Sequence, residues 1–475
     1  AHNRMIEGAA VNVKDFGAVG DGVTDDTLAI KAAIDSLTPF GGNVYFPQGI
    51  YLVSELQTGG VPQGCCVKVE YPIRLIGENS IYTAIRPANS VGSTVHTIQF
   101  SPNIGYAHDY SGVESLFLGN PNNGTRAGKH GVFADTQAAG QQLPGFFLRY
   151  LNVGSSAVSG ALAFLHVNVP ANNINGGLYT ARIENSSLRG GIELQGSGDS
   201  IQITKNIISA NNIGIDSNQV AGASLLSIVD NNITSFGGSI RINQGLRVHI
   251  ERNNIEHYSA NSSGNDNAMI NFNCGSGAAV GGVIQKNLVS AYGSTDATKL
   301  VRLKECNGML VKDNVFLTGV GGITAIDVTT NSANVRLGGN AYNAAIATKI
   351  ADIGNGTMGF QKDINSTLQN SWVKNSASED VKVYKDLSGI VTLEGACKSG
   401  TATPGTTILT LPVGFRPATT VRFAVYSTGG SVAGVGRVDI TSGGVVTIED
   451  GGNTLLSLNG VRFLASDAAN GVSFE

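Results

Sequence analysis

One short phrase recurs seven times between residues 180 and 343. It consists of an apolar residue, two polar residues, an asparagine, and another apolar residue within two positions, as in IQITKNII and VRLGGNAY. The aligned asparagines are separated by 21, 26, 22, 33, 27 and 26 residues, and they are Asn185, Asn206, Asn232, Asn254, Asn287, Asn314 and Asn340. A period of this length built from short alternating strands is typical of a solenoid. The phrase therefore predicts a parallel β-helix.

The recurring asparagine is expected at a bend between strands. An asparagine side chain tolerates tight-turn geometry, and its amide can hydrogen-bond to the coil above or below. A single coil cannot bury its own apolar face, whereas stacked coils share a continuous core. We therefore expect the asparagines to mark the same corner of successive coils.

The composition agrees with this architecture and excludes several functional classes. Hydrophobic residues make up 41% of the chain, which is enough for a large core and excludes general disorder. The net charge of -4 is spread along the chain, which argues against a nucleic-acid-binding surface or a basic membrane-surface helix. The sequence has no apolar stretch of about 18 residues, so we expect no membrane insertion.

The two ends of the chain follow other patterns. Residues 24–37 predict a helix that closes the N-terminal mouth of the solenoid, with Asp25 or Asp26 as its cap and an apolar stripe that includes Leu28. Beyond about residue 375, alternating strands with Gly/Pro turns predict an antiparallel β-sandwich. The predicted organisation is a lead-in at 1–20, a catalytic β-helix at 21–350, a linker at 351–374 and the sandwich at 375–475, which would serve in trimerisation or carbohydrate binding.

The opening segment VNVKDFGAVGDGVTDDTLAIKAAID, followed by GGNVYFPQGIYLV, resembles the pectate-lyase-like β-helix family and, more narrowly, bacteriophage tailspike depolymerases. The resemblance is close over residues 11–85 and continues through the asparagine coils to about 345. It implies a right-handed parallel β-helix and a homotrimer in the virion that cleaves a bacterial surface polysaccharide, capsule or O-antigen. It also implies synthesis in the host cytoplasm and attachment to the phage tail through a missing N-terminal region. The resemblance to the family does not identify catalytic residues in this sequence.

The first candidate site comes from the register of the asparagine phrase. Alignment predicts an inward row of Ile183, Ile203, Val229, Ile250, Ile284 and Val311. The following residues then form an outward row in which Asp230 and Glu251 are direct neighbours, while His249 lies between Ile228 and Val283 in a second row. Two charges 5 Å apart interact by roughly 3 kcal/mol at an effective dielectric of 20, which favours sharing one proton. Such a pair suits a retaining glycosidase, and a wider one of about 6.5–9.5 Å an inverting glycosidase. The alternative is a solvated polar ladder whose acids bond to neighbouring asparagines, Arg252 or Lys205.

A second outward row carries the other candidate pair. Glu193 and Asp216 are expected one coil and two residues apart, about 8 Å between Cα atoms, a separation that suits an inverting glycosidase. Arg241 and Arg302 in this row are expected to bind an acidic sugar, with a structural ladder of acids and arginines as the alternative.

Two enlarged loops complete the predicted site. Residues 256–268 place His257, Tyr258 and Asp266 on a protrusion beside the Asp230/Glu251 coils, where they would contact carbohydrate. Residues 101–147 carry Tyr106, His108, Tyr110, Arg126 and His130, which would form an opposite wall or pack in a trimer.

Three functions compete at this point. A hydrolase would use a carboxylate pair, and a lyase would use His249, Tyr258 or Arg241 on a uronic acid. A non-catalytic receptor-binding spike is the third. We expect no cofactor and no metal, because the acidic opening motif is explained by turns and helix capping.

Overall fold

The computed structural model describes residues 10–103, 108–122, 124–136, 141–156, 163–168, 177–196, 198–219, 225–243, 247–257, 267–274, 281–292, 298–329, 331–352, 357–386, 388–430 and 434–466. Two compact units divide the chain: one contains 1–306, 313–329 and 340–351, and the other contains 307–312, 330–339 and 352–475. Within the described residues, no helix is long and apolar enough to span a membrane.

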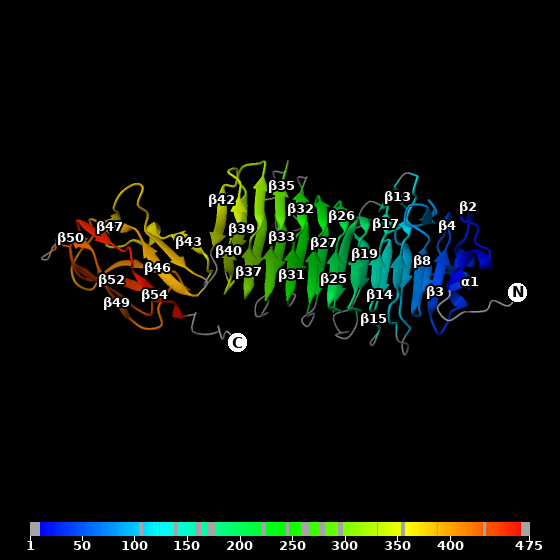
Figure 1. Ribbon diagram of the computed structural model, residues 1–475, viewed down its shortest axis with the longest axis horizontal. Coiled ribbons are helices and arrows are strands. Elements are labelled where there is room, and N and C mark those ends of the chain that lie inside the picture. The colour runs from blue at the N-terminus through cyan, green and yellow to red at the C-terminus, as the bar shows by residue number, and fades with distance from the viewer. Residues whose placement is uncertain are drawn as a thin grey trace. The chain divides into compact units, whose positions relative to one another are not determined.

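The solenoid consists of three long parallel sheets, and successive coils add a strand to each (Figure 1). Sheet I contains β1 (Val11–Asn12), β3 (Gly42–Phe46), β8 (Ile73–Gly77), β11 (Gly112–Glu114), β16 (Phe147–Arg149), β21 (Arg182–Glu184), β25 (Ile201–Thr204), β28 (Leu226–Val229), β31 (Val248–Glu251), β34 (Gly282–Gln285), β37 (Met309–Lys312) and β40 (Arg336–Gly338). The predicted parallel β-helix is confirmed.

Sheet II contains β2 (Asp21–Asp25), β4 (Gly49–Val53), β9 (Thr83–Pro87), β12 (Phe117–Leu118), β17 (Asn152–Val153), β22 (Ser187–Arg189), β26 (Ile207–Ala210), β29 (Asn232–Ser235), β32 (Asn254–His257), β35 (Leu288–Ala291), β38 (Val315–Thr318) and β41 (Ala341–Tyr342). Sheet III contains β7 (Cys65–Val69), β10 (His96–Phe100), β14 (Val132–Asp135), β19 (Ala163–Asn168), β23 (Gly191–Gly196), β27 (Ile215–Gln219), β30 (Ile240–Asn243), β33 (Ala268–Asn273), β36 (Lys299–Lys304), β39 (Thr324–Val328) and β42 (Thr348–Asp352). Short sheets join β5 (Gln57–Thr58) to β6 (Val61–Pro62), β13 (Thr125–Arg126) to β18 (Ser155–Ser156), and β15 (Gln142–Pro144) to β20 (Gly177–Tyr179) and β24 (Gly198–Asp199).

Branched aliphatic side chains fill the interior of the coils. In sheet I, Ile203, Ile228, Ile250 and Ile284 stand in register and are fully buried. Burying one such side chain contributes roughly 1.5–3 kcal/mol. The predicted inward position of Val229 is wrong, because Ile228 occupies the interior and Val229 is partly exposed on the outer face.

A ladder of asparagines runs along the corner between sheets I and II. All are buried except the half-buried Asn340, and they are Asn206, Asn231, Asn253, Asn287, Asn314 and Asn340. Asn253 Nδ2 donates to Asn287 Oδ1 at 2.9 Å and to the Ile228 carbonyl at 2.8 Å, and the pattern repeats along the ladder. The residue before each asparagine has a positive φ in several coils, as in Asp230 and Arg252. The predicted ladder positions Asn185, Asn232 and Asn254 are wrong, because they lie one residue off this corner.

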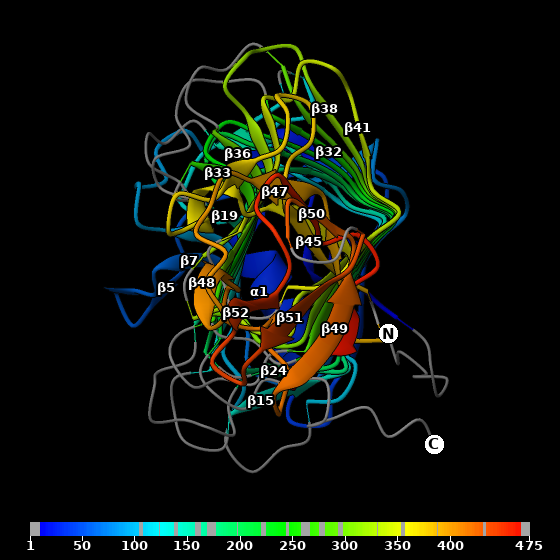
Figure 2. The same cartoon turned by 90° about the vertical axis from the view of Figure 1, so that its left-hand side faces the viewer.

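A helix stands at the N-terminal end of the solenoid, within the outline of the three sheets (Figures 1 and 2). It is α1 (Thr27–Asp35), shorter than the predicted 24–37 because residues 21–25 form β2, and it follows the 3-10 turn η1 (Val13–Phe16). Asp26 is the N-cap residue, but its carboxylate accepts hydrogen bonds from Val19 and Gly20 instead of from the helix. The predicted burial of Leu28 is wrong, since this side chain is 70% exposed.

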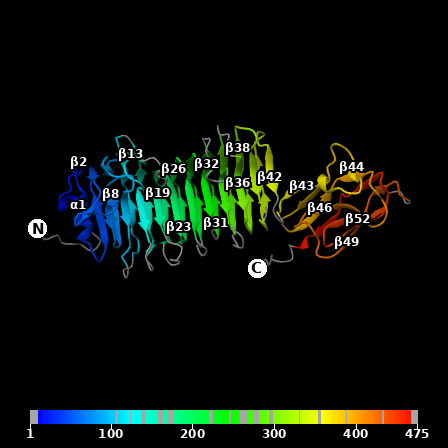
Figure 3. The same ribbon diagram turned by 180° about the vertical axis from the view of Figure 1, so that it is seen from behind.

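The second unit contains three four-stranded antiparallel sheets around an apolar core (Figure 3). The first joins β43 (Phe360–Asp363), β45 (Lys382–Lys385), β46 (Ile390–Glu394) and β54 (Arg462–Leu464). The second joins β44 (Val373–Lys374), β47 (Ala396–Lys398), β53 (Leu455–Ser457) and β50 (Ser427–Thr428). The third joins β48 (Thr406–Thr410), β52 (Val445–Asp450), β51 (Gly436–Ile440) and β49 (Val421–Val425). The predicted linker 351–374 in fact carries β43, the 3-10 turn η3 (Asn365–Thr367) and β44.

Candidate functional site

A continuous outward row of polar and aromatic side chains crosses sheet III. Strand register places its members directly beside one another from coil to coil, because adjacent parallel strands lie about 4.8 Å apart. The row consists of Phe133, His166, Glu193, Asp216, Arg241, Asn271, Arg302 and Asp327. It brings together three carboxylates, an imidazole and two guanidinium groups.

Glu193 and His166 form the first close contact of this row. His166 Nδ1 lies 2.8 Å from Glu193 Oε2, and both side chains are 15% exposed. Although burial raises the pKa of Glu193, the hydrogen bonds from His166 and Gln195 and the nearby His130 charge bring it below its ordinary value. Glu193 is therefore ionised at neutral pH, so Nδ1 of His166 carries the hydrogen of their hydrogen bond.

Asp216 and Arg241 form the second contact. Arg241 Nε donates to Asp216 Oδ1 at 2.8 Å, and its Nη2 bonds the other carboxylate oxygen, a bidentate arrangement. The predicted two-residue offset between Glu193 and Asp216 is wrong, because β23 and β27 pair these residues directly. Their backbones are consequently separated by about 5 Å rather than 8 Å. Both side chains line one small pocket, together with Gly191, Ile192, Asn212, Ile213 and Arg241.

A stack of imidazole rings extends the site toward the N-terminal coils. His96 and His130 stack with ring centroids 5.1 Å apart, and His130 and His166 follow at 4.8 Å. Phe133 lies against His96 at 4.1 Å. Sequence reasoning missed His96, His166 and Phe133, because the asparagine phrase begins only at residue 180 and nothing before it marks the register. The histidine spacings of 34 and 36 residues, about one enlarged coil each, are the signal that was available.

At the other end of the row, the charged side chains are paired with each other. Arg302 Nε lies 3.5 Å from Asp327 Oδ2, and Asn271, which is buried, separates Arg302 from Arg241 in the register. Each of the two arginines in the row is thus paired with an aspartate of the row. Among the described residues, no group of three or more His, Cys, Asp or Glu side chains is arranged to hold a metal ion.

The candidate acids on sheet I are arranged differently from the prediction. The predicted direct stacking of Asp230 on Glu251 is wrong, because Val229 is the residue in register with Glu251. Asp230 lies at the bend, where Arg252 binds its carboxylate at 2.7 and 3.1 Å and holds its pKa below the ordinary value. His249 stands between Ser227 and Val283, so the predicted neighbour Ile228 is also wrong.

Glu251 is enclosed by cationic and polar groups. Its carboxylate contacts His249 Nε2 at 2.9 Å, Arg252 Nη1 at 2.7 Å and Lys286 Nζ at 3.4 Å, and the side chain is 9% exposed. Burial raises the pKa of Glu251, but the Gln285 hydrogen bond and the Arg252 charge outweigh burial and lower it overall. Glu251 is therefore an ionised carboxylate at the centre of a salt-bridge cluster.

The residues predicted to lie on the two enlarged loops differ in their observed positions. The placement of His257 on a protrusion is wrong, because it ends β32 with its side chain fully buried between Ser235 and Ala291. Tyr258 and Asp266 lie outside the described residues, as do Tyr106 and the side chain of Arg126. In the other predicted loop, His108 and His130 are buried, whereas Tyr110 is 61% exposed.

Comparisons with known proteins agree with this architecture. Residues 10–241 match the family described as "Rhamnogalacturonase A/epimerase, pectate lyase-like". A stretch of 76 residues is 46% identical to mannuronan C5-epimerase AlgE2 of Azotobacter vinelandii, covering 16% of this chain and 7% of that protein. The chain therefore spans less than a tenth of the length of this curated relative.

Two solved structures are similar to this chain. DFA-IIIase from Arthrobacter chlorophenolicus A6 is 13% identical, with a TM-score of 0.52, over 73% of this chain and 92% of that one. The Dettilon tailspike protein is 13% identical, with a TM-score of 0.47, over 96% of this chain and 94% of that one. The first unit is thus a parallel β-helix, and residues 10–241 are similar to the pectate-lyase-like family.

Proposed function

We propose that the chain is a polysaccharide depolymerase that hydrolyses glycosidic bonds on the outer face of sheet III. The observation that carries the proposal is the direct register of Glu193 and Asp216 in one pocket, each with its own partner. Carboxyl groups about 5–5.5 Å apart suit a retaining glycosidase, in which one carboxylate attacks the sugar and the other group transfers the proton. The family match to rhamnogalacturonases and epimerases supports a glycan substrate.

The two partners suggest how the roles divide. Arg241 holds the Asp216 carboxylate in a bidentate contact, which orients it for attack on the anomeric carbon as the glycosidic C–O bond breaks. The leaving oxygen then takes a proton from the imidazolium form of His166, which the ionised Glu193 holds in place. Water later attacks the anomeric carbon, releases the Asp216 carboxylate as the Asp216–sugar bond breaks, and returns a proton to the imidazole. Arg302, farther along the row, would bind sugar hydroxyl groups.

The biological setting is part of the proposal. The opening motif resembles tailspikes, and an antiparallel unit follows the β-helix. Both features support a homotrimeric phage tailspike that acts outside the host cell on capsule or O-antigen. The second unit would serve trimerisation or carbohydrate binding.

A second candidate function, elimination from a uronic acid, is favoured by one specific contact. The His166–Glu193 hydrogen bond leaves Nε2 of His166 as a base, so this imidazole could remove the proton next to a uronate carboxylate. Against this reaction, both arginines of the row already have acidic partners in the chain.

Product analysis separates the candidates. The protein is incubated with a panel of purified bacterial capsular and O-antigen polysaccharides, and product size, reducing ends and ultraviolet absorbance are followed. Hydrolysis predicts shorter chains with new reducing ends and no absorbance. An unsaturated, ultraviolet-absorbing end would replace the hydrolase proposal with the lyase. Glycan that is bound but never shortened would instead indicate a receptor-binding spike.

A further inference from the structure

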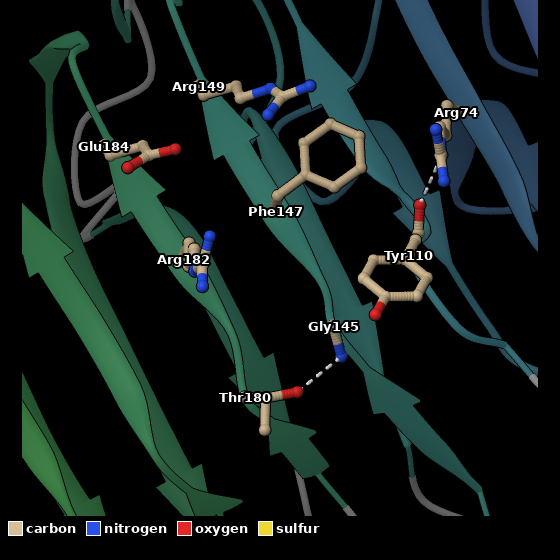
Figure 4. A pocket seen from close by; sticks show the side chains of 8 residues that line it. All are labelled: Arg74, Tyr110, Gly145, Phe147, Arg149, Thr180, Arg182 and Glu184. Carbon is tan, nitrogen blue, oxygen red and sulfur yellow. Dashed lines mark hydrogen bonds between the residues drawn. The ribbon is translucent and has the colours of Figure 1, made fainter.

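A second hollow lies on the outer face of sheet I, away from the Glu193 row on sheet III. It has a volume of about 480 Å³, within the range of small-molecule sites, and it is open to solvent on one side. Figure 4 shows the eight residues that line it, which are Arg74, Tyr110, Gly145, Phe147, Arg149, Thr180, Arg182 and Glu184. They come from four successive coils.

Two glycines lie close to the aromatic rings of the hollow: Gly145 lines it, and Gly112 lies next to its residues in the sheet. Gly112 stands in register between Arg74 and Phe147, and a Cβ there would lie 2.1 Å from the Phe147 carbonyl oxygen and 2.9 Å from its ring. Gly145 has a φ of 61°, and a Cβ there would lie 3.1 Å from the Tyr110 ring. Larger residues would therefore displace both aromatic rings.

Two aromatic rings and three arginines surround this space. Arg74 lies 5.7 Å from the Tyr110 ring centroid and 6.0 Å from that of Phe147, and Arg149 lies 4.8 Å from Phe147. Tyr110 is 61% exposed, so its ring surface faces solvent. Aromatic rings of this kind can pack against the apolar face of a sugar.

The charges of the hollow do not balance. Arg149 binds Glu114 at 2.8 Å, and Arg74 donates to the Tyr110 carbonyl at 3.1 Å. Glu184, in register with Arg149, is the one acid in the lining, against three arginines. Counting Glu114 as well, the cluster keeps one positive charge, and Arg182 is exposed at its rim. The sheet III row, by contrast, pairs both of its arginines with acids.

We propose that this hollow binds a carboxylate-bearing sugar, a uronic acid residue of a glycan chain, through its arginines. A guanidinium group matches a carboxylate in shape and can bind it with two parallel hydrogen bonds, while Phe147 and Tyr110 contact the sugar ring. The proposal rests on the proposed function only in taking the ligand to be a glycan. It assigns a binding site on a different sheet, and it implies that the glycan is acidic.

A binding experiment tests the site without requiring activity. The full chain carrying Glu193→Gln is titrated calorimetrically with tetragalacturonate, with a glucuronate tetramer, and with the carboxyl-reduced form of each. We expect at least one acid form to bind, its reduced form to bind at least tenfold more weakly, and 0.5 M NaCl to weaken binding. A sulfated neutral tetramer that binds better than both acids would overturn the carboxylate assignment.

Variants locate the site. Arg182→Gln and Arg74→Gln should each weaken binding at least fivefold, whereas Arg462→Gln, an exposed arginine on β54, should change it less than twofold. Thermal unfolding of each variant verifies the fold. The proposal fails if neither acidic tetramer binds, if reduced and acidic forms bind equally, or if Arg182→Gln binds like the parent. The Glu193→Gln variant separates the two proposals. Its catalytic activity tests the Glu193–Asp216 pair on sheet III, and its binding of the acidic tetramers tests the hollow on sheet I.

Discussion

Two clusters of acidic residues lie on different sheets of the same solenoid, and their surroundings differ. On sheet III, Glu193 and Asp216 are neighbours in register, and each binds one basic partner. On sheet I, Glu251 contacts three basic side chains, and the nearby Asp230 turns at the bend toward Arg252. Two neighbouring acids that each bind one basic partner are suited to acid–base catalysis. An acid surrounded by cations is suited to holding coils together.

The largest expected effect tests the sheet III pair. Glu193→Gln and Asp216→Asn should each lower the rate of polysaccharide cleavage by about 10²–10⁴, the usual contribution of an acid–base group. The measurement is the rate of reducing-end release. The matched control is Asp439→Asn in the second unit, because Asp439 also binds arginine and is 13% exposed like Asp216. Rates within about threefold of the parent in both test variants would remove the pair from catalysis.

The next effect tests the asparagine ladder at the corner between sheets I and II. Asn253→Ala removes the acceptor of the Asn231 amide groups and leaves the Ile228 carbonyl without its bond, all in buried surroundings. At about 1–3 kcal/mol for each unsatisfied group, the free energy of unfolding should fall by about 3 kcal/mol or more. Asn254→Ala, one residue on and partly exposed, should cost less than about 1 kcal/mol. Equal losses in denaturant unfolding would contradict the ladder.

Glu251→Gln tests the structural role of the sheet I cluster. Loss of the charge weakens the contacts to His249 and Arg252, so we expect the unfolding free energy to drop by about 1–3 kcal/mol. Cleavage should stay within about threefold of the parent. Asp230→Asn, at a more exposed site, should cost less than about 1 kcal/mol. A hundredfold loss of cleavage in Glu251→Gln would move the catalytic proposal to sheet I and reverse the comparison.

The smallest effect is in the pH dependence of stability. Glu193 and Glu251 both have pKa values lowered by folding, so their stabilising contacts are complete above the unfolded-state value of about 4.3 and are lost as the pH falls through the lower folded value. Stability should therefore decline below about pH 4.3. Each Glu→Gln variant should show a shallower decline in urea unfolding between pH 5 and 3. A parent-like slope in the Glu193 variant would mean that its bond to His166 contributes nothing to folding.

The predicted and observed sites differ chiefly by one residue of register. The phrases VDNNIT and ERNNI each contain two adjacent asparagines. The prediction placed Val229, three residues before Asn232, beside Ile250, which is four residues before Asn254, and so put Asp230 beside Glu251. Counted from the ladder asparagines Asn231 and Asn253, the inward residues Ile228 and Ile250 are both three residues back, so Val229 pairs with Glu251. Since side chains alternate in a strand, a slip of one residue exchanges the two faces. Nothing local distinguishes the two asparagines; only bonding to the neighbouring coil does.

The sequence by itself determined the parallel β-helix and the antiparallel second unit, because repeating apolar alternation and turn residues are local properties of the chain. It also selected Glu193, Asp216 and Arg241 as outward residues. Only the tertiary structure decided that Glu193 meets His166, that His257 is buried, and that Gly112 and Gly145 lie close to the aromatic rings of a hollow with three arginines. These contacts join residues 22 to 38 positions apart, and coils of unequal length set which residues meet.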